Sequence, residues 1–285
     1  MHVDSLTMSE PLKVFASATA VESQEHIKPF HRHIALRLVL EGGFLPEEIT
    51  PHPPLRLRQT PNGPALEFDP AAETVGEMTV FGGMKTKQID VVVAKHGIGP
   101  VLAVSVKGTL NAYRNLVNRM EEAIGDSTNV HVMYPGLVYG FLHLLRANRQ
   151  AGGYGPRDAG VCLNGEVSPL IRRYSTALCE MTGRRFVRND HTRYEAVGLA
   201  LVENEPASSG AIHTGFPDPA SPLRIETFFA RLYEVYDLRF PSRAERLPLA
   251  RRAAWSPESP FLQDLTATHG KALEEILGYS PRLTA

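Results

Sequence analysis

The chain has 285 residues, of which 43% are hydrophobic, and its 30 Lys and Arg face 31 Asp and Glu for a net charge of −1. This length supports one large domain, or a core with a sizeable appendage. The balanced charge excludes the uniformly basic surface of a protein that coats nucleic acid, so a polyanion has to be bound by local clusters. No Walker-type phosphate loop occurs, which argues against an ATP-driven motor.

Cysteine usage and the first residues indicate the compartment. Cys162 and Cys179 are too few for a disulfide framework and lack the CxxC spacing of a zinc site, which indicates a reducing environment. Residues 1–10 carry acids where a secretory signal needs a basic start and an apolar run. No window offers the roughly 20 apolar residues of a membrane helix. We therefore expect a cytoplasmic protein that does not associate with a membrane.

The N-terminal part contains one strong helical pattern. Residues 1–19 have the character of an irregular leader, and residues 20–41 then show apolar side chains at steps of three and four, which predicts a helix. Gly42-Gly43 is a plausible stop for it. Proline-rich, turn-like segments follow on both sides of a short possible strand at residues 55–58.

The centre of the chain predicts a β-hairpin. Residues 88–95 (QIDVVVAK) and 101–107 (VLAVSVK) are nearly continuous apolar or β-branched runs, typical of strands that are covered on both faces. The short HGIGP turn between them joins the two strands in antiparallel orientation.

After the hairpin we expect a helix over residues 110–124 that ends at Gly125-Asp126, a strand at residues 129–134 and a helix over residues 137–148. The resulting order predicts an α/β fold with a mixed central sheet flanked by helices.

The character of the chain changes beyond residue 150, where a glycine-rich connection begins. We expect a helix over residues 169–181, a strand at residues 194–203 and a helix over residues 225–236. The predicted organisation is therefore a core over residues 20–150 and a C-terminal elaboration over residues 151–285.

Polar residues interrupt the two predicted hairpin strands at three positions. Asp90 lies within QIDVVV, and Ser105 and Lys107 share one face of VLAVSVK because side chains alternate along a strand. A hairpin that turns near Gly97 to Gly99 places Asp90 opposite the Ser105–Lys107 stretch. One interpretation is a partly buried salt bridge that ties the hairpin together. The other is an acid that binds a metal beside a lysine that neutralises a phosphate or orients a water.

A magnesium site requires a further carboxylate, and the helix predicted after the hairpin offers two. Glu121 lies about 95° from the centre of the apolar stripe, on its flank, whereas Glu122 points almost directly away. Glu121 is therefore the acid that can lean back toward the strand end. Arg114 lies on the same flank, where it can pair with Glu121 or reach a phosphate.

Asp90 together with Ser105-Val106-Lys107 resembles the PD-(D/E)xK nuclease superfamily, the fold of most restriction endonucleases. The family usually has Glu where this chain has Ser105. One subgroup carries Ser-x-Lys instead and takes its glutamate from the next helix, fourteen residues past the lysine, which corresponds to Glu121.

The resemblance implies a restriction-endonuclease-like core in αβββαβ order and a catalytic set of Asp90, Ser105, Lys107 and Glu121. Asp90 and Glu121 would ligate Mg²⁺, for which Mn²⁺ can substitute, with help from the Val106 carbonyl. Lys107 would assist the attacking water.

The chain also departs from the family pattern. Ile89 occupies the position of the usual proline, and the spacing from Asp90 to Lys107 is shorter than in the Ser-x-Lys subgroup. The segment RHIALRLVLEGGFLPEEITPHPPLRL resembles the opening helix and turn of the nuclease domain in type I restriction subunits. By that resemblance Glu41 or Glu22 could add a ligand; otherwise each is an exposed acid.

Arginines are concentrated in two segments, residues 184–193 and 239–252. Solvated arginines are common on protein surfaces, but on a nuclease they become candidates for contacts with phosphates and guanine edges. The expected DNA-contacting set is Arg114, Arg184, Arg185, Arg188 and Arg193.

These patterns predict an Mg²⁺-dependent endodeoxyribonuclease that cuts duplex DNA in restriction or phage defence. It would act as a homodimer, with residues 151–285 as the candidate region for recognition or dimerisation. Three alternatives remain: a nuclease subunit of a larger defence system that acts on modified DNA or RNA, a catalytically decayed nuclease fold that binds DNA or proteins, and an unrelated α/β protein.

Overall fold

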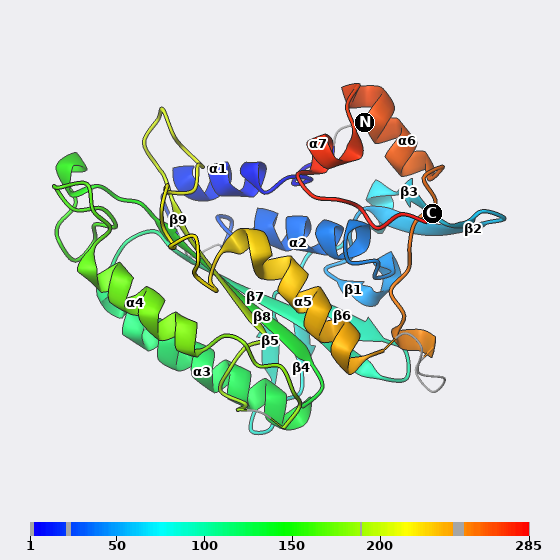
Figure 1. The fold of residues 1–285 in the computed structure, drawn as a ribbon, viewed down its shortest axis with the longest axis horizontal. Helices are drawn as coiled ribbons and strands as arrows, with labels where there is room; N and C mark the ends of the chain where they lie inside the picture. The colour runs from blue at the N-terminus through cyan, green and yellow to red at the C-terminus, as the bar shows by residue number, and fades with distance from the viewer. Residues whose placement is uncertain (1–2, 21–23, 189, 242–247, 285) are drawn as a thin grey trace.

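A computed structural model describes residues 3–20, 24–188, 190–241 and 248–284. Its centre is a five-stranded mixed sheet in the order β1-β6-β7-β8-β9, in which β6 is antiparallel to both neighbours and β7, β8 and β9 are parallel (Figure 1). These strands are β1 Ile49–Thr50, β6 Val91–Lys95, β7 Gly99–Thr109, β8 Val138–Arg146 and β9 Ala196–Val202. The expected α/β class with a mixed central sheet is confirmed.

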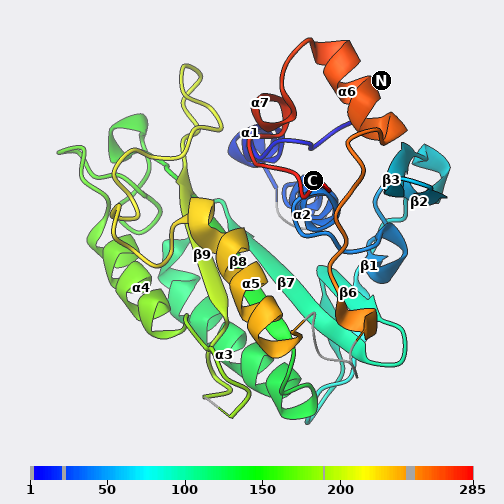
Figure 2. The ribbon, with the colours of Figure 1, turned by 45° about the vertical axis from the view of Figure 1, so that its right-hand side comes forward.

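Helices cover both faces of this sheet (Figures 1 and 2). The α-helices are α1 Ser9–Ser17, α2 Lys28–Leu40, α3 Leu116–Met133, α4 Pro169–Glu180, α5 Ile225–Arg239, α6 Pro260–His269 and α7 Leu273–Leu277. On one face α3 and α4 pack against the sheet, and on the other face α2 and α5 share a core cluster with α1, α6 and α7. None of the helices in the described part of the chain is long and apolar enough to cross a membrane.

Short elements complete the fold. Two small hairpins lie outside the central sheet: β2 Leu55–Thr60 with β3 Gly63–Phe68, and β4 Met78–Val80 with β5 Lys87–Ile89. The 3-10 helices are η1 Pro46–Glu48, η2 Pro70–Ala72, η3 Tyr113–Asn115, η4 Gln150–Gly152 and η5 Pro248–Ala250.

Two predicted elements between residues 125 and 148 are wrong. The helix does not stop at Gly125 but continues as α3 through the expected strand, because an exposed glycine costs a helix only about 1 kcal/mol. The expected helix over residues 137–148 is β8. Its side chains are buried on both faces of the sheet, so its sequence is almost uniformly apolar. A uniformly apolar run has no periodicity that separates a buried strand from a buried helix. Gly140 belongs in this strand because a Cβ there would lie 2.7 Å from the Phe228 ring.

The other predicted elements fare better. The helices over residues 169–181 and 225–236 correspond to α4 and α5, and the antiparallel hairpin is formed by β6 and β7. The helix expected over residues 20–41 is α2, which begins only at Lys28. The expected irregular leader is wrong, because α1 buries Leu12 and Phe15 in the core. The segment beyond residue 150 supplies β9, which pairs with β8 and completes the sheet.

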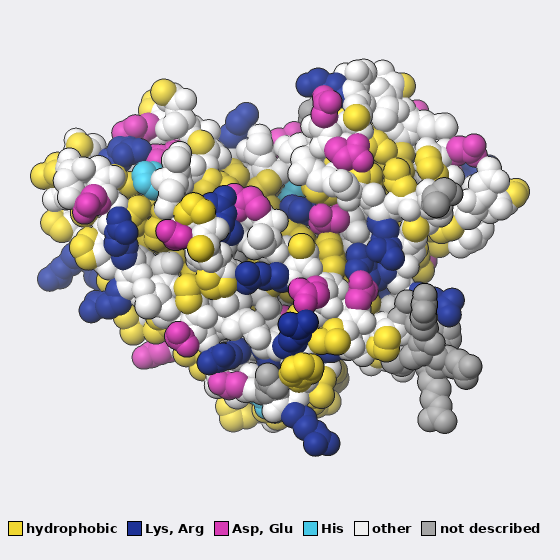
Figure 3. Space-filling model, viewed as in Figure 1, with side chains coloured by type: hydrophobic (Ala, Val, Ile, Leu, Met, Phe, Trp, Pro, Cys, Tyr) yellow, Lys and Arg dark blue, Asp and Glu magenta, His cyan; other side chains and the backbone are white. Residues whose placement is uncertain are grey.

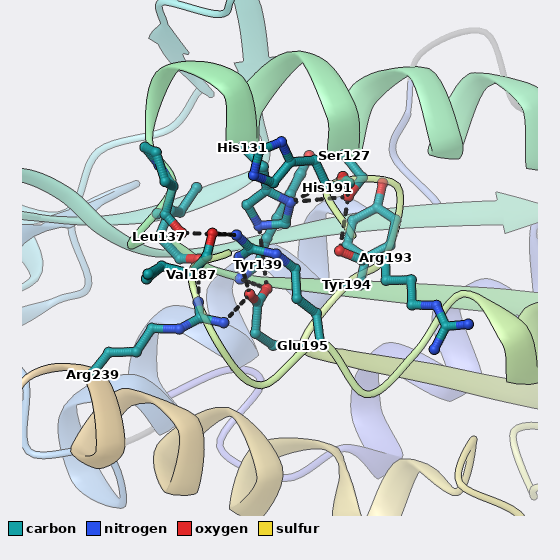
Figure 4. A network of polar contacts seen from close by, with 12 residues as sticks. Ser127, His131, Leu137, Tyr139, Val187, His191, Arg193, Tyr194, Glu195 and Arg239 are labelled. Carbon is teal, nitrogen blue, oxygen red and sulfur yellow. Dashed lines mark hydrogen bonds and ion pairs between the residues drawn. The ribbon is translucent and has the colours of Figure 1, made fainter. Parts of the chain in front are cut away.

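A buried ionic network fixes the start of β9 (Figure 4). The Glu195 carboxylate accepts bonds from Arg184 and Arg239 at 2.6 Å each and from the Tyr139 backbone N–H at 2.7 Å. His131 of α3 lies 3.4 Å from the same carboxylate. Both arginine side chains and Glu195 are almost fully buried, so these charges exist in the interior only because they neutralise one another.

Replacement of Glu195 by alanine is expected to destabilise the fold by about 3–5 kcal/mol, because it leaves two guanidinium groups buried without their counter-ion. Urea denaturation followed by circular dichroism measures the loss. The matched control is Glu234→Ala, which removes an exposed partner of Arg185 and is expected to change stability by less than about 0.5 kcal/mol. Equal effects of the two substitutions would contradict the role of the buried network.

Candidate functional site

The chain changes its strand partner at Asp90. On one side β5 pairs with β4, where Ile89 is opposite Met78, and on the other side β6 pairs with β7, where Val91 is opposite Val104. The strand expected over residues 88–95 is thus split at the acid. Continuing both registers by one residue brings Glu77 and Ser105 to the level of Asp90, so this position lies at the junction of two sheets.

The Asp90 side chain closes this junction. Its Oδ2 accepts a hydrogen bond of 2.7 Å from the Val106 N–H, and the residue is only 6% exposed. The carboxylate therefore satisfies a backbone donor of β7 at a point where β6 no longer continues. Its other oxygen, Oδ1, lies 3.3 Å from Nε2 of His31 on α2.

Glu77 lies immediately before β4, and its carboxyl group shares a hydrogen bond with that of Asp90. Burial raises the pKa of Asp90 above its usual range, against the opposing effects of the Val106 N–H and the Lys107 charge. Burial and the Asp90 charge also raise the pKa of Glu77. Two carboxyl groups in contact favour holding a proton between them, and a divalent cation in place of that proton removes the repulsion.

His31 and Lys107 complete the group. Burial lowers the pKa of His31 to about 4, so its imidazole is uncharged at neutral pH and its contact with Asp90 is not an ion pair. Lys107 is half-buried, and its positive charge acts on Asp90, Glu77 and His31. The structure therefore brings together Asp90 and Lys107, as expected, with two residues that were not expected.

Ser105 lies at the level of Asp90 but its hydroxyl bonds elsewhere, and Glu121 and Arg114 are surface residues. Ser105 is buried and its Oγ is hydrogen-bonded to the Tyr139 hydroxyl at 2.8 Å, which gives it a packing role. Glu121 and Arg114 are exposed, on α3 and η3 respectively. The carboxyl group that contacts Asp90 is that of Glu77 instead.

Glu41 and Glu22 are the two other candidate acids. Glu41 pairs with Arg37 at 2.7 Å at the end of α2. Glu22 lies outside the described residues.

The expectation for Arg184 is wrong. Its guanidinium is buried and donates to Glu195 and to the carbonyls of Pro135 and Val187, so it cannot reach a DNA backbone. Arg185, Arg188 and Arg193 are exposed. Lysine and arginine side chains are interspersed with acids on the face drawn in Figure 3, so no broad basic surface lies there.

The donor set at Asp90 fits a magnesium ion. Carboxylate oxygens are the ligands that Mg²⁺ prefers, and it commonly takes one or two of them and completes its shell with water and phosphate oxygens. No group of three or more His, Cys, Asp or Glu among the described residues is arranged to hold a metal ion. The Val106 N–H points to Asp90, and in an extended strand the carbonyl of the same residue points to the same side.

Glu77 and His31 escaped detection from the sequence for different reasons. Glu77 precedes a three-residue strand that no pattern predicted, and only the register of β4 with β5 reveals that it faces Asp90. His31 lies on a helix that is buried on most of its surface, so its neighbours give no sign of a polar contact.

No family model, no curated protein and no solved structure matches the chain. Its function has to be inferred from the chemistry of the group formed by Asp90, Glu77, Lys107 and His31.

Without a divalent cation, Asp90→Asn is expected to raise the melting temperature at pH 8. The pKa of Asp90 is raised on folding, so its favourable contribution is present below its unfolded pKa of about 3.9 and is lost as pH rises through the folded value. Asparagine removes the repulsion and still accepts a bond from Val106. A gain of about 1 kcal/mol corresponds to roughly 2–4 °C, measured by thermal denaturation in EDTA.

The gain is expected to shrink as pH falls and Asp90 takes up its proton, which a second measurement at pH 4 tests. Asp264→Asn, at an exposed position, is the control and should leave the melting temperature unchanged at both pH values. A lower melting temperature of Asp90→Asn at pH 8 would show that the carboxylate stabilises the fold.

Acid is expected to unfold the protein through its buried histidines. Burial lowers the pKa to about 4 for His31 and His33 and to about 3 for His143. Neutral imidazoles stabilise the fold above the unfolded pKa of about 6.5, and this is lost as pH falls toward the folded values, by up to about 1.4 kcal/mol per pH unit for each histidine. The urea midpoint between pH 7.5 and 4.5 measures the loss.

His143→Gln keeps an uncharged polar side chain at this position and should make the urea midpoint less dependent on pH, whereas His269→Gln, at an exposed position, should not. A midpoint that is constant from pH 7 to 5 in the wild type would refute the expected effect.

Proposed function

We propose that the chain is a divalent-metal-dependent nuclease that hydrolyses phosphodiester bonds of duplex DNA. The observation that carries the proposal is the buried Asp90 carboxyl in contact with Glu77, beside Lys107 at the end of β7. The placement of Asp90 before one strand of a hairpin and of Lys107 on the other resembles the PD-(D/E)xK nucleases. The proposal therefore takes the central sheet as a restriction-endonuclease-like core.

Each residue has a distinct role in the proposal. Asp90 and Glu77 would hold Mg²⁺ or Mn²⁺, with the Val106 carbonyl as a further oxygen donor. A bound Mg²⁺ supplies Lewis-acid stabilisation of the charge that develops on a phosphodiester during hydrolysis. Lys107 holds a positive charge beside the carboxyl pair and would orient a phosphate oxygen or the attacking water. His31 supports Asp90 from α2.

The substrate contacts would come from exposed arginines. Arg114 lies in η3, the element that follows β7, and Arg185, Arg188 and Arg193 lie on the loop before β9. A balanced overall charge fits a selective cutter better than a non-specific one. Two copies of the chain related by a two-fold axis would cut both strands, as in a restriction or phage-defence enzyme.

The proposal predicts metal-dependent cleavage that depends on Glu77 and not on Glu121. Plasmid and phage DNA are incubated with Mg²⁺, Mn²⁺ or EDTA, and the wild type is compared with Asp90→Asn, Glu77→Gln, Lys107→Ala and Glu121→Gln. The first three are expected to lose activity by more than the 10–100-fold that removal of a residue supporting a metal ligand usually costs, roughly. Glu121→Gln serves as the matched carboxylate control and should cleave within about twofold of wild type.

Calorimetric titration with Mn²⁺ provides a readout that does not require the right DNA. Asp90→Asn and Glu77→Gln should weaken Mn²⁺ binding, and Glu121→Gln should not. Loss of cleavage in Glu121→Gln with full activity in Glu77→Gln would identify Glu121 of α3, and not Glu77, as the second carboxylate of the site. Absence of both cleavage and Mn²⁺ binding in the wild type would rule out the nuclease and favour a binding protein.

A further inference from the structure

A cavity of about 910 Å³ lies beside the candidate site. Its walls come from α1, α2, residues 51–53 and residues 73–77, and they include Glu77 and His31. Both of these side chains contact Asp90, so the cavity and the carboxyl pair share a wall. The volume is in the range of pockets that hold a small organic molecule.

The charges of the cavity disfavour a phosphate. Of the described residues that line it, five are acidic and two are basic. Both basic side chains already have carboxylate partners, since Arg32 binds Glu73 at 2.5 and 2.7 Å and Lys28 binds Glu25 at 2.5 Å. An anion in the cavity would face an excess of carboxylates, whereas an uncharged group that donates hydrogen bonds would be favoured.

The remaining lining of the cavity is mainly apolar. The apolar lining consists of Val14, Pro29, Ala35, Pro51, Pro53 and Val75. The His31 side chain is 9% exposed and lines the cavity, and its Nε2 faces the Asp90 carboxylate at 3.3 Å. Apolar walls with a few polar groups are the usual composition of a small-molecule site.

We propose, on the basis of the proposed function, that this cavity binds one unpaired nucleobase of the substrate that carries an exocyclic amino group: adenine, cytosine or guanine. The group next to a phosphodiester in a nucleic acid is an uncharged nucleoside, which matches an acidic cavity next to a phosphodiester site. Its amino group donates to the carboxylates, and its ring lies against the apolar walls. A base enters such a cavity from a single strand or after leaving the duplex, which is easiest at a mismatched or damaged position.

Saturation-transfer NMR on the full chain, without metal or DNA, tests this site with deoxyadenosine, deoxycytidine, deoxyguanosine and thymidine as probes. The three amino-bearing nucleosides are expected to give signals at least about twofold stronger than thymidine, and deoxycytidine 5′-monophosphate should bind more weakly than deoxycytidine. Val14→Trp, at an exposed position of α1 in the cavity wall, should abolish the signals. Val117→Trp, at an exposed position of α3 away from the cavity, should preserve them.

Circular dichroism of both variants establishes that they are folded. Equal signals from wild type and Val14→Trp, or no signal from any nucleoside, would overturn the nucleobase site even if the protein cleaves DNA. Stronger binding of the monophosphate than of the nucleoside would also overturn it. Because the experiment contains no DNA and no metal, failure of the nuclease proposal leaves its outcome unaffected.

Discussion

The hydrogen bond from the Val106 N–H to the Asp90 carboxylate is the contact on which the candidate site depends. A single extended segment serves two sheets, because β5 pairs with β4 and β6 pairs with β7. At the transition β7 loses β6 as its partner on one edge but stays paired with β8 on the other, and a side chain takes over as acceptor on the open edge. This requirement holds a carboxylate in the interior, at a level where it also meets Glu77 and His31 near the start of α2.

Asp90 and Glu195 are two buried carboxylates whose pKa values are shifted in opposite directions. Burial by itself favours a higher pKa for both. For Glu195 the bond to His131 and the charges of Arg239 and Arg184 outweigh burial, so its pKa is lowered. Asp90 has a lysine and a second carboxyl group as neighbours, and its pKa is raised. A fully compensated charge holds elements together, whereas an incompletely compensated one beside a cavity is the arrangement found at functional sites.

The sequence predicts this protein best where local pattern and tertiary environment agree. The helical segments α4 and α5 and the hairpin around Gly97 and Gly99 follow from periodicity and turn chemistry. Asp90 and Lys107 stand out as polar residues in apolar strands. The identity of β8 depends on packing against α5 and on pairing with β7, which a uniformly apolar run does not encode. The position of Glu77 depends on the pairing of a short strand. The inward orientation of Arg184 depends on its ion pair with Glu195, eleven residues away.

The inward-facing Arg184 has a consequence for the loop that follows it. Its guanidinium binds the carbonyl of Val187, within the loop, as well as Glu195 at the loop's far end. Ser127 and His131 of α3 contact backbone carbonyls of the same loop at His191 and Arg193. Arg184 therefore holds the loop from its inner side through Val187 and Glu195. These contacts tie described residues of the loop to α3 and to Glu195, so a ligand that meets Arg185, Arg188 or Arg193 has less main-chain entropy to overcome.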